Sequence, residues 1–115
     1  AGKAALENTF FSSLYSPDDT SDLNKDFVAE YKKAYNTNPD VFAALAYDST
    51  LLVAKAIEDA GSADPAKIAE AMAKIKGFKG VSGEVTFNEE HNPIKSAVII
   101  EHKDGKQTFK TKVNP

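Results

Sequence analysis

The sequence contains no cysteine among its 115 residues. The absence of thiols excludes disulfide bonds, thiolate catalysis and zinc sites with cysteine ligands. A chain of this kind is compatible with the cytoplasm, and equally with exported proteins that fold without disulfides.

Arginine is absent as well: all 14 basic residues are lysines, and the formal net charge is −3. Arginine supplies the planar fork that grips phosphates and guanine edges, so its absence argues against nucleic-acid binding. The lysines are spread among acidic residues and form no basic stripe. The sequence therefore predicts no nucleic-acid partner.

Long apolar runs are also missing. A transmembrane helix needs roughly 20 apolar residues, and the longest candidate, residues 41–60, is interrupted by Tyr47, Asp48 and Lys55. The chain does not begin with the basic and apolar regions of a secretory signal peptide. We therefore expect either a cytoplasmic protein or a mature or trimmed chain.

The residues that are present predict one α/β domain. Hydrophobic residues make up 42% and charged residues 27% of the 12.4 kDa chain, which is an ordinary globular balance. Apolar periodicity predicts a strand, three helices and a final run of three antiparallel strands, over residues 8–15, 20–35, 39–60, 64–76, 83–87, 94–102 and 107–113.

Local signals support these boundaries. Asp64 followed by Pro65 is typical of a helix start, and Asp104-Gly105 is typical of a type I′ hairpin turn. Phe78 and Lys79 lie among closely spaced glycines and are expected in a loop.

No arrangement of residues predicts catalysis, a metal site or a cofactor. Asp18 and Asp19 lie between a proline and a helix start, where capping and turn roles explain them. Residues 89–91 (Glu-Glu-His) are adjacent on a turn, whereas metal sites usually gather ligands from separated positions. We therefore do not expect an enzyme.

The helix over residues 39–60 is apolar around more than half of its circumference, which predicts partners beyond the rest of this chain. Near its start, Phe42 and Tyr47 could stack on a ligand, and Asp48 could pair with an ammonium group. The alternative is that the two rings are core residues and that Asp48 is an exposed helix position.

Nine segments carry a family resemblance by their order and spacing. They are NTFFSSLYSPDD (8–19), FVAEY (27–31), NPD (38–40), FAALAYDS (42–49), DP (64–65), FKGVSG (78–83), TFN (86–88), NPIKSA (92–97) and VNP (113–115). Together they resemble the type I periplasmic binding proteins, and above all the solute-binding proteins of branched-chain amino-acid ABC transporters.

The resemblance implies an α/β fold of two lobes that close on a small ligand, of which this chain matches only the C-terminal part. Residues 1–36 would belong to the second lobe, residues 37–80 would supply helices of the first lobe, and residues 81–115 would form a crossover and hairpin strands. In the family an aromatic residue early in the crossover helix lines the cleft, and Phe42 matches it. Tyr15 and Tyr47 lie near crossovers, and Asp48 is a further candidate. The resemblance implies half a binding site at most.

The implied function is the extracytoplasmic amino-acid-binding component of an ABC importer, either in a periplasm or lipid-anchored, with a membrane permease as partner. Its ligand would be an amino acid, most simply a branched-chain one, and lobe closure would need no cofactor. Two alternatives are a ligand-sensing regulatory domain of the same fold and a small stand-alone enzyme. We also expect the isolated chain to self-associate through the apolar helix and its strand edges.

Overall fold

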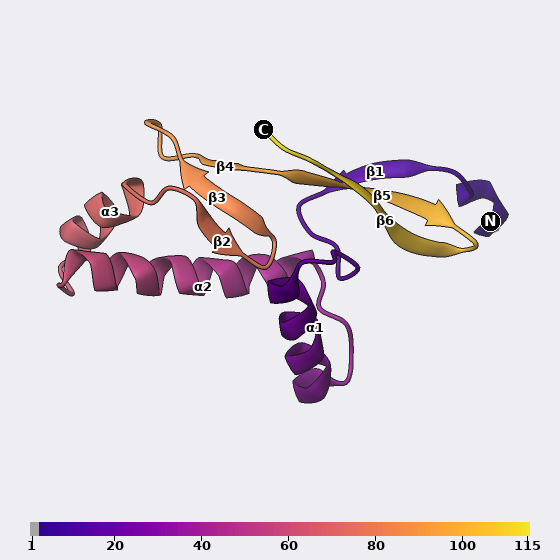
Figure 1. The fold of residues 1–115 in the computed structure, drawn as a ribbon, viewed down its shortest axis with the longest axis horizontal. Coiled ribbons are helices and arrows are strands. Elements are labelled where there is room, and N and C mark those ends of the chain that lie inside the picture. Colours follow the sequence, from indigo (N-terminus) through magenta and orange to yellow (C-terminus); the bar gives the residue numbers. More distant parts are fainter. Residues whose placement is uncertain (1–2) are drawn as a thin grey trace.

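The computed structural model describes residues 3–115, in which one early strand is followed by three helices and then by five short strands (Figure 1). In chain order they are η1 (Lys3–Leu6), β1 (Phe10–Ser13), α1 (Asp22–Tyr35), α2 (Val41–Ala60), α3 (Pro65–Ala73), β2 (Phe78–Gly80), β3 (Gly83–Phe87), β4 (Pro93–Lys95), β5 (Ala97–Lys103) and β6 (Lys106–Val113). The predicted strand, three helices and later strands are all found, with shorter bounds at several ends.

The strands form two antiparallel sheets of three strands each, in the orders β1-β5-β6 and β2-β3-β4. The sequence predicted one continuous antiparallel run after residue 83, and in this detail it was wrong. The predicted strand over 94–102 is divided at Ser96, so that β4 pairs with β3 while β5 pairs with β1 and β6.

The expected loop at Phe78 and Lys79 is instead strand β2. Phe78 pairs with Val85 and Gly80 pairs with Gly83, which makes β2 and β3 a hairpin with a two-residue connection. The prediction failed because closely spaced glycines are typical of loops as well as of tight hairpins. Here Gly83 instead serves the hairpin, with a φ of 113° that other residues rarely adopt.

Local chemistry accounts for the helix and hairpin ends. The Asp40 carboxylate accepts a hydrogen bond from the Ala43 amide at the start of α2, and the Asp64 carboxylate accepts two from amides of the first turn of α3. Asp104 and Gly105 both have positive φ values, 52° and 71°, as a type I′ turn requires. The predicted α3 start and β5–β6 turn are therefore confirmed.

Helix α2 connects two small apolar cores. One core contains Leu52, Ala56, Ile75 and Val85, and lies between α2, α3 and the β2-β3-β4 sheet. The other contains Tyr15, Ala44 and Val81, with partly buried side chains packed around it. The buried side of α2 therefore faces the β2-β3-β4 sheet.

The chain divides into two units that lie side by side along its longest axis (Figure 1). We call β1, β5 and β6 the sheet unit, and α1, α2, α3 and β2–β4 the helical unit. The sheet unit extends away from all three helices, and the overall dimensions are 53 × 33 × 25 Å. The chain passes between the units at residues 14–21 and again at Ser96.

The outer side of α2 is bare. Val53 and Ile57 are each 43% exposed, although both are large apolar residues. This exposure agrees with the predicted surplus of apolar surface on this helix, because nothing within residues 3–115 covers that side.

Candidate functional site

The four residues predicted to contact a ligand do not meet in one cavity. Phe42 is 77% exposed near the start of α2, and Tyr47 lies between α1 and α2. Tyr15 and Asp48 are buried, with exposures of 4% and 2%. The alternative interpretation had placed the Phe42 and Tyr47 rings in the core and Asp48 on the surface, and the structure reverses that placement.

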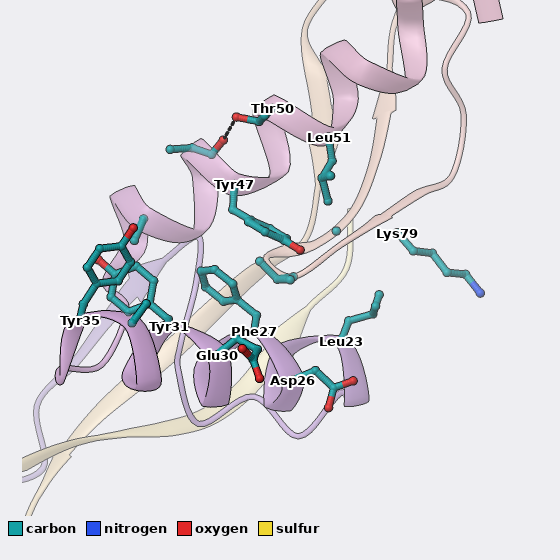
Figure 2. A pocket seen from close by; sticks show the side chains of 15 residues that line it. Leu23, Asp26, Phe27, Glu30, Tyr31, Tyr35, Tyr47, Thr50, Leu51 and Lys79 are labelled. Atoms are coloured by element: carbon teal, nitrogen blue, oxygen red, sulfur yellow. Dashed lines mark hydrogen bonds between the residues drawn. The ribbon is translucent and has the colours of Figure 1, made fainter. Parts of the chain in front are cut away.

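An aromatic groove of about 870 Å³ separates α1 from α2 (Figure 2). The Phe27 and Tyr47 rings lie 4.8 Å apart between their centroids, and Tyr31 and Tyr35 lie 4.6 Å apart. The Phe27–Tyr47 contact joins α1 to α2, whereas Tyr31 and Tyr35 both lie on α1. The groove provides apolar surface, with few polar groups to orient a ligand.

A second cavity of about 680 Å³ lies where the sheet unit meets the start of α2. We call it the crossover cleft. Its lining mixes apolar and polar side chains from β1, the 14–21 crossover, the start of α2, β5 and β6, and consists of Phe11, Ser13, Tyr15, Ser16, Pro17, Asp18, Asn38, Pro39, Asp40, Val41, Ile100, Lys106 and Gln107. A cavity with both characters suits a small ligand that carries charged and apolar parts.

Tyr15 links the crossover cleft to the core. Its ring packs edge-on against Phe27, with centroids 6.3 Å apart, and its hydroxyl oxygen has no hydrogen-bond partner within residues 3–115. Burial raises the pKa of Tyr15 well above its ordinary value, and the carboxylates of Asp19, Asp18 and Asp48 raise it further. The phenol is therefore a neutral hydrogen-bond donor at any physiological pH.

Asp48 has a different role from the one that its helix position predicted. Its carboxylate accepts hydrogen bonds from the Val81 amide at 2.8 Å and the Ser82 amide at 2.9 Å, and another from the Ser82 hydroxyl. A Cβ at Gly80 would lie 2.5 Å from the Asp48 carboxylate. Asp48 therefore holds the β2–β3 turn against α2, and glycine at position 80 makes room for it.

Sequence analysis missed the lysines at this junction. Lys95 donates to the Ser82 hydroxyl at 2.6 Å, and Lys112 forms an ion pair of 2.6 Å with Asp19. Local sequence spacing indicates neither contact, because Lys95 lies 13 residues from Ser82 and Lys112 lies 93 residues from Asp19. The turn role predicted for Asp19 is confirmed, since its carboxylate also accepts from the Ser21 amide at 2.9 Å.

In the part of the chain that the structure describes, no three histidine or acidic side chains gather closely enough to hold a metal ion. None of the helices within residues 3–115 has the length and apolar character needed to cross a bilayer.

Comparison with known proteins gives one consistent result. The periplasmic binding protein family model matches residues 1–107. A leucine-, isoleucine-, valine-, threonine- and alanine-binding protein of Pseudomonas aeruginosa is 39% identical over 67 residues, which is 57% of this chain and 17% of that protein.

Two solved structures share the fold. A leucine-binding protein of Thermotoga maritima is 38% identical with a TM-score of 0.85, and the match covers 96% of this chain and 32% of that one. The substrate-binding protein of a branched-chain amino-acid transporter from Streptococcus pneumoniae, in complex with isoleucine, is 37% identical with a TM-score of 0.82, and the match covers 95% and 31%. The chain thus spans about a third of these relatives, which are binding proteins and not enzymes.

Proposed function

Because the chain belongs to the periplasmic binding protein family, we propose that it is the C-terminal part of the extracytoplasmic solute-binding component of an ABC importer. The ligand that we propose is a branched-chain amino acid, which the whole protein would deliver to a membrane permease. The relatives named for leucine and isoleucine support this ligand class. In the structure, the crossover cleft between two units is the observation that carries the proposal.

We propose that the two units belong to different lobes of the longer protein. The β1, β5 and β6 strands fall within the ranges predicted for the second lobe and the final hairpins, and α2 and α3 fall within the range predicted for the first lobe. The assignment of all of residues 1–36 to the second lobe stays a prediction, and the ring contact between Phe27 and Tyr47 favours placing α1 with α2. Rotation about the two crossovers would then open and close the cleft.

Among the candidate contacts, Phe42 and Tyr15 fit this proposal best. Phe42 follows directly on Asp40 and Val41, which line the crossover cleft, and its exposed ring is free to cover the apolar side chain of a ligand. Tyr15 lines the same cleft. Tyr47 belongs to the aromatic groove, and both oxygens of Asp48 are engaged by the β2–β3 turn, so these two would support the site indirectly.

The first experiment is to measure the mass of the natural gene product. Because 96% of this 12.4 kDa chain matches 32% of the Thermotoga relative, we expect a protein of roughly 37 kDa. A natural product of 12.4 kDa would contradict the two-lobed mechanism.

Calorimetric titration of that longer protein with leucine, isoleucine and valine then tests the ligand. We expect Phe42→Ala to weaken binding by roughly 10-fold or more, because truncation of a large apolar contact costs on the order of 1–3 kcal/mol. Val53→Ala is the control, since Val53 is an exposed apolar residue of the same helix that lies 12 positions beyond Val41, the α2 residue that lines the crossover cleft. Equal affinities for the two variants would contradict the proposed role of Phe42.

A ligand-sensing regulatory domain of the same fold remains the second candidate. The fold is common to both functions, so the discriminating observation is the chain that follows Pro115 in the natural product. A further effector or DNA-binding domain after this position would favour the sensor.

A further inference from the structure

An ion pair joins the two units beside the crossover. Nζ of Lys112, on β6 of the sheet unit, lies 2.6 Å from Oδ2 of Asp19, in the segment that leads to α1. The Asp19 side chain is 10% exposed and that of Lys112 is 32% exposed, so this pair is more protected from solvent than the surface pair of Lys25 and Asp22.

Asp19 is attached firmly to the helical unit. Asn24, a fully buried residue of α1, donates its side-chain amide to the carbonyl oxygens of Asp19 at 2.8 Å, Pro17 at 3.1 Å and Ser16 at 3.4 Å. The crossover segment from residue 16 to residue 19 is thereby fixed to the first turn of α1. The position of Asp19 is therefore coupled to the position of α1.

Lys112 is attached equally firmly to the sheet unit. It lies opposite Val98 in the β5–β6 ladder, and Val98 is only 3% exposed. The pair therefore connects the sheet unit to the helical unit, neither of which supplies both partners.

A second polar contact lies beside the other crossover, at Ser96. Lys95, the last residue of β4 before the break at Ser96, donates to the Ser82 hydroxyl, and Asp48 holds Ser82 in place. Lys95 is close enough to both Asp48 and Lys112 for their charges to act on its pKa, which burial lowers most strongly. Lys95 thus lies near both Asp48 and the Lys112 member of the ion pair.

The ionisation of Asp19 agrees with a close pair. Burial alone would raise the pKa of Asp19, yet its hydrogen bonds from Lys112 and Ser21 and the charge of Lys112 hold the pKa below its ordinary value. The charges of Asp19, Asp18 and Asp48 all act on the pKa of Tyr15, and the charges of Asp48 and Lys112 act on the pKa of Lys95.

We propose that the Asp19–Lys112 ion pair is a latch that sets the angle between the sheet unit and the helical unit. Asp19 and Lys112 are positioning residues, because neither needs to touch a ligand to act. The inference rests on the proposed function only in regarding the two units as parts of two lobes.

Distances between spin labels on the 115-residue chain, diluted with excess unlabelled chain so that distances between associated copies do not contribute, test the latch without any ligand. The chain has no native cysteine, so Lys103→Cys on the sheet unit and Glu58→Cys on α2 would carry the only labels. Pulsed electron paramagnetic resonance then gives the distribution of distances between the units. We expect Lys112→Met and Asp19→Asn each to broaden this distribution and add a tail that the parent chain lacks.

Two further variants separate the latch from a general loss of charge. Lys110→Met removes an ion pair of 3.0 Å with Glu101 that lies wholly within the sheet unit, so we expect the parent distribution. Lys112→Arg keeps the cation and is expected to restore the narrow distribution. A parent-like distribution in both Lys112→Met and Asp19→Asn, or equal broadening in Lys110→Met, would overturn the latch.

The readout is independent of the proposed function. A latch confirmed in a chain whose longer form binds no amino acid would leave the positioning role intact and refute only the ligand. Amino-acid binding with an unchanged distribution in the latch variants would refute only the latch. Circular dichroism of each variant establishes that its helices are retained, and a variant that loses them is replaced by the other of the pair.

Discussion

At the scale of single residues, the close packing of Gly80 against Asp48 leaves no room for a side chain at position 80. A methyl group at position 80 would meet the Asp48 carboxylate at 2.5 Å, and that carboxylate is fixed by two backbone amides. We expect Gly80→Ala to destabilise the chain by about 1–3 kcal/mol, the usual cost of overpacking. Chemical denaturation measures this change.

The double variant tests the cause. Asp48→Ala alone leaves the Val81 and Ser82 amides without their acceptor and is also expected to destabilise. Because the clash exists only while the carboxylate is present, Gly80→Ala combined with Asp48→Ala should cost less than the sum of the single changes. Strict additivity would show that the two residues do not interact in this way.

Asp19 gives a prediction in pH. Since its folded-state pKa lies below the ordinary value of 3.8, the unfolded chain binds the proton more readily, and the stability contributed by Asp19 falls as pH decreases. We expect the difference in unfolding free energy between the parent and Asp19→Asn to be constant above about pH 5 and to shrink as pH falls below the ordinary pKa of the carboxyl group.

Asp22→Asn is the matched comparison for that titration. Asp22 also lies near the start of α1 and faces a lysine, but its side chain is 97% exposed. The difference between the parent and this variant should stay small, because an exposed ion pair contributes little to stability. An Asp19→Asn difference that persists unchanged at pH 2 would contradict the ion-pair account.

At the scale of elements, the helix starts differ in how much their capping residues contribute. Asp64 accepts hydrogen bonds from the Ala66 and Lys67 amides, whereas Ser21 at the start of α1 makes no side-chain cap bond. We expect Asp64→Ala to lower stability by about 1 kcal/mol and Ser21→Ala to change it by much less. Thermal unfolding followed by circular dichroism compares the two, and equal losses would contradict the assignment.

The elements that sequence predicted correctly are those with local causes. The helices follow from apolar spacing and capping residues within a few positions, and the β5–β6 hairpin follows from Asp104-Gly105. Strand β2 was missed because the glycines of its hairpin are also typical of a loop, and the division at Ser96 was missed because strand partners are chosen by pairing across the fold. The same reason applies at the site: Asp48 meets its partners 33 and 34 residues away, and no pattern within α2 indicates them.

At the scale of the whole molecule, the chain has two small cores and a large amount of uncovered apolar surface. Phe42, Val53 and Ile57 are exposed along α2, and none of α1, α2 and α3 covers the sheet unit in the described part of the chain (Figure 1). A longer family member would cover such surfaces with its remaining two thirds, whereas the isolated chain has only other copies of itself. Exposed apolar helix faces and open strand edges are the surfaces through which chains associate.

We therefore expect the isolated 115-residue chain to self-associate in a concentration-dependent way, as measured by multi-angle light scattering. Val53→Lys together with Ile57→Lys should shift the population towards the monomer of 12.4 kDa, because it places charge on the bare side of α2. Glu58→Lys adds a lysine to the same helix without removing an apolar contact, and should leave the association in place. A parent chain that is monomeric throughout would contradict the prediction, and dissociation by Glu58→Lys alone would show that charge, and not the apolar face, controls it.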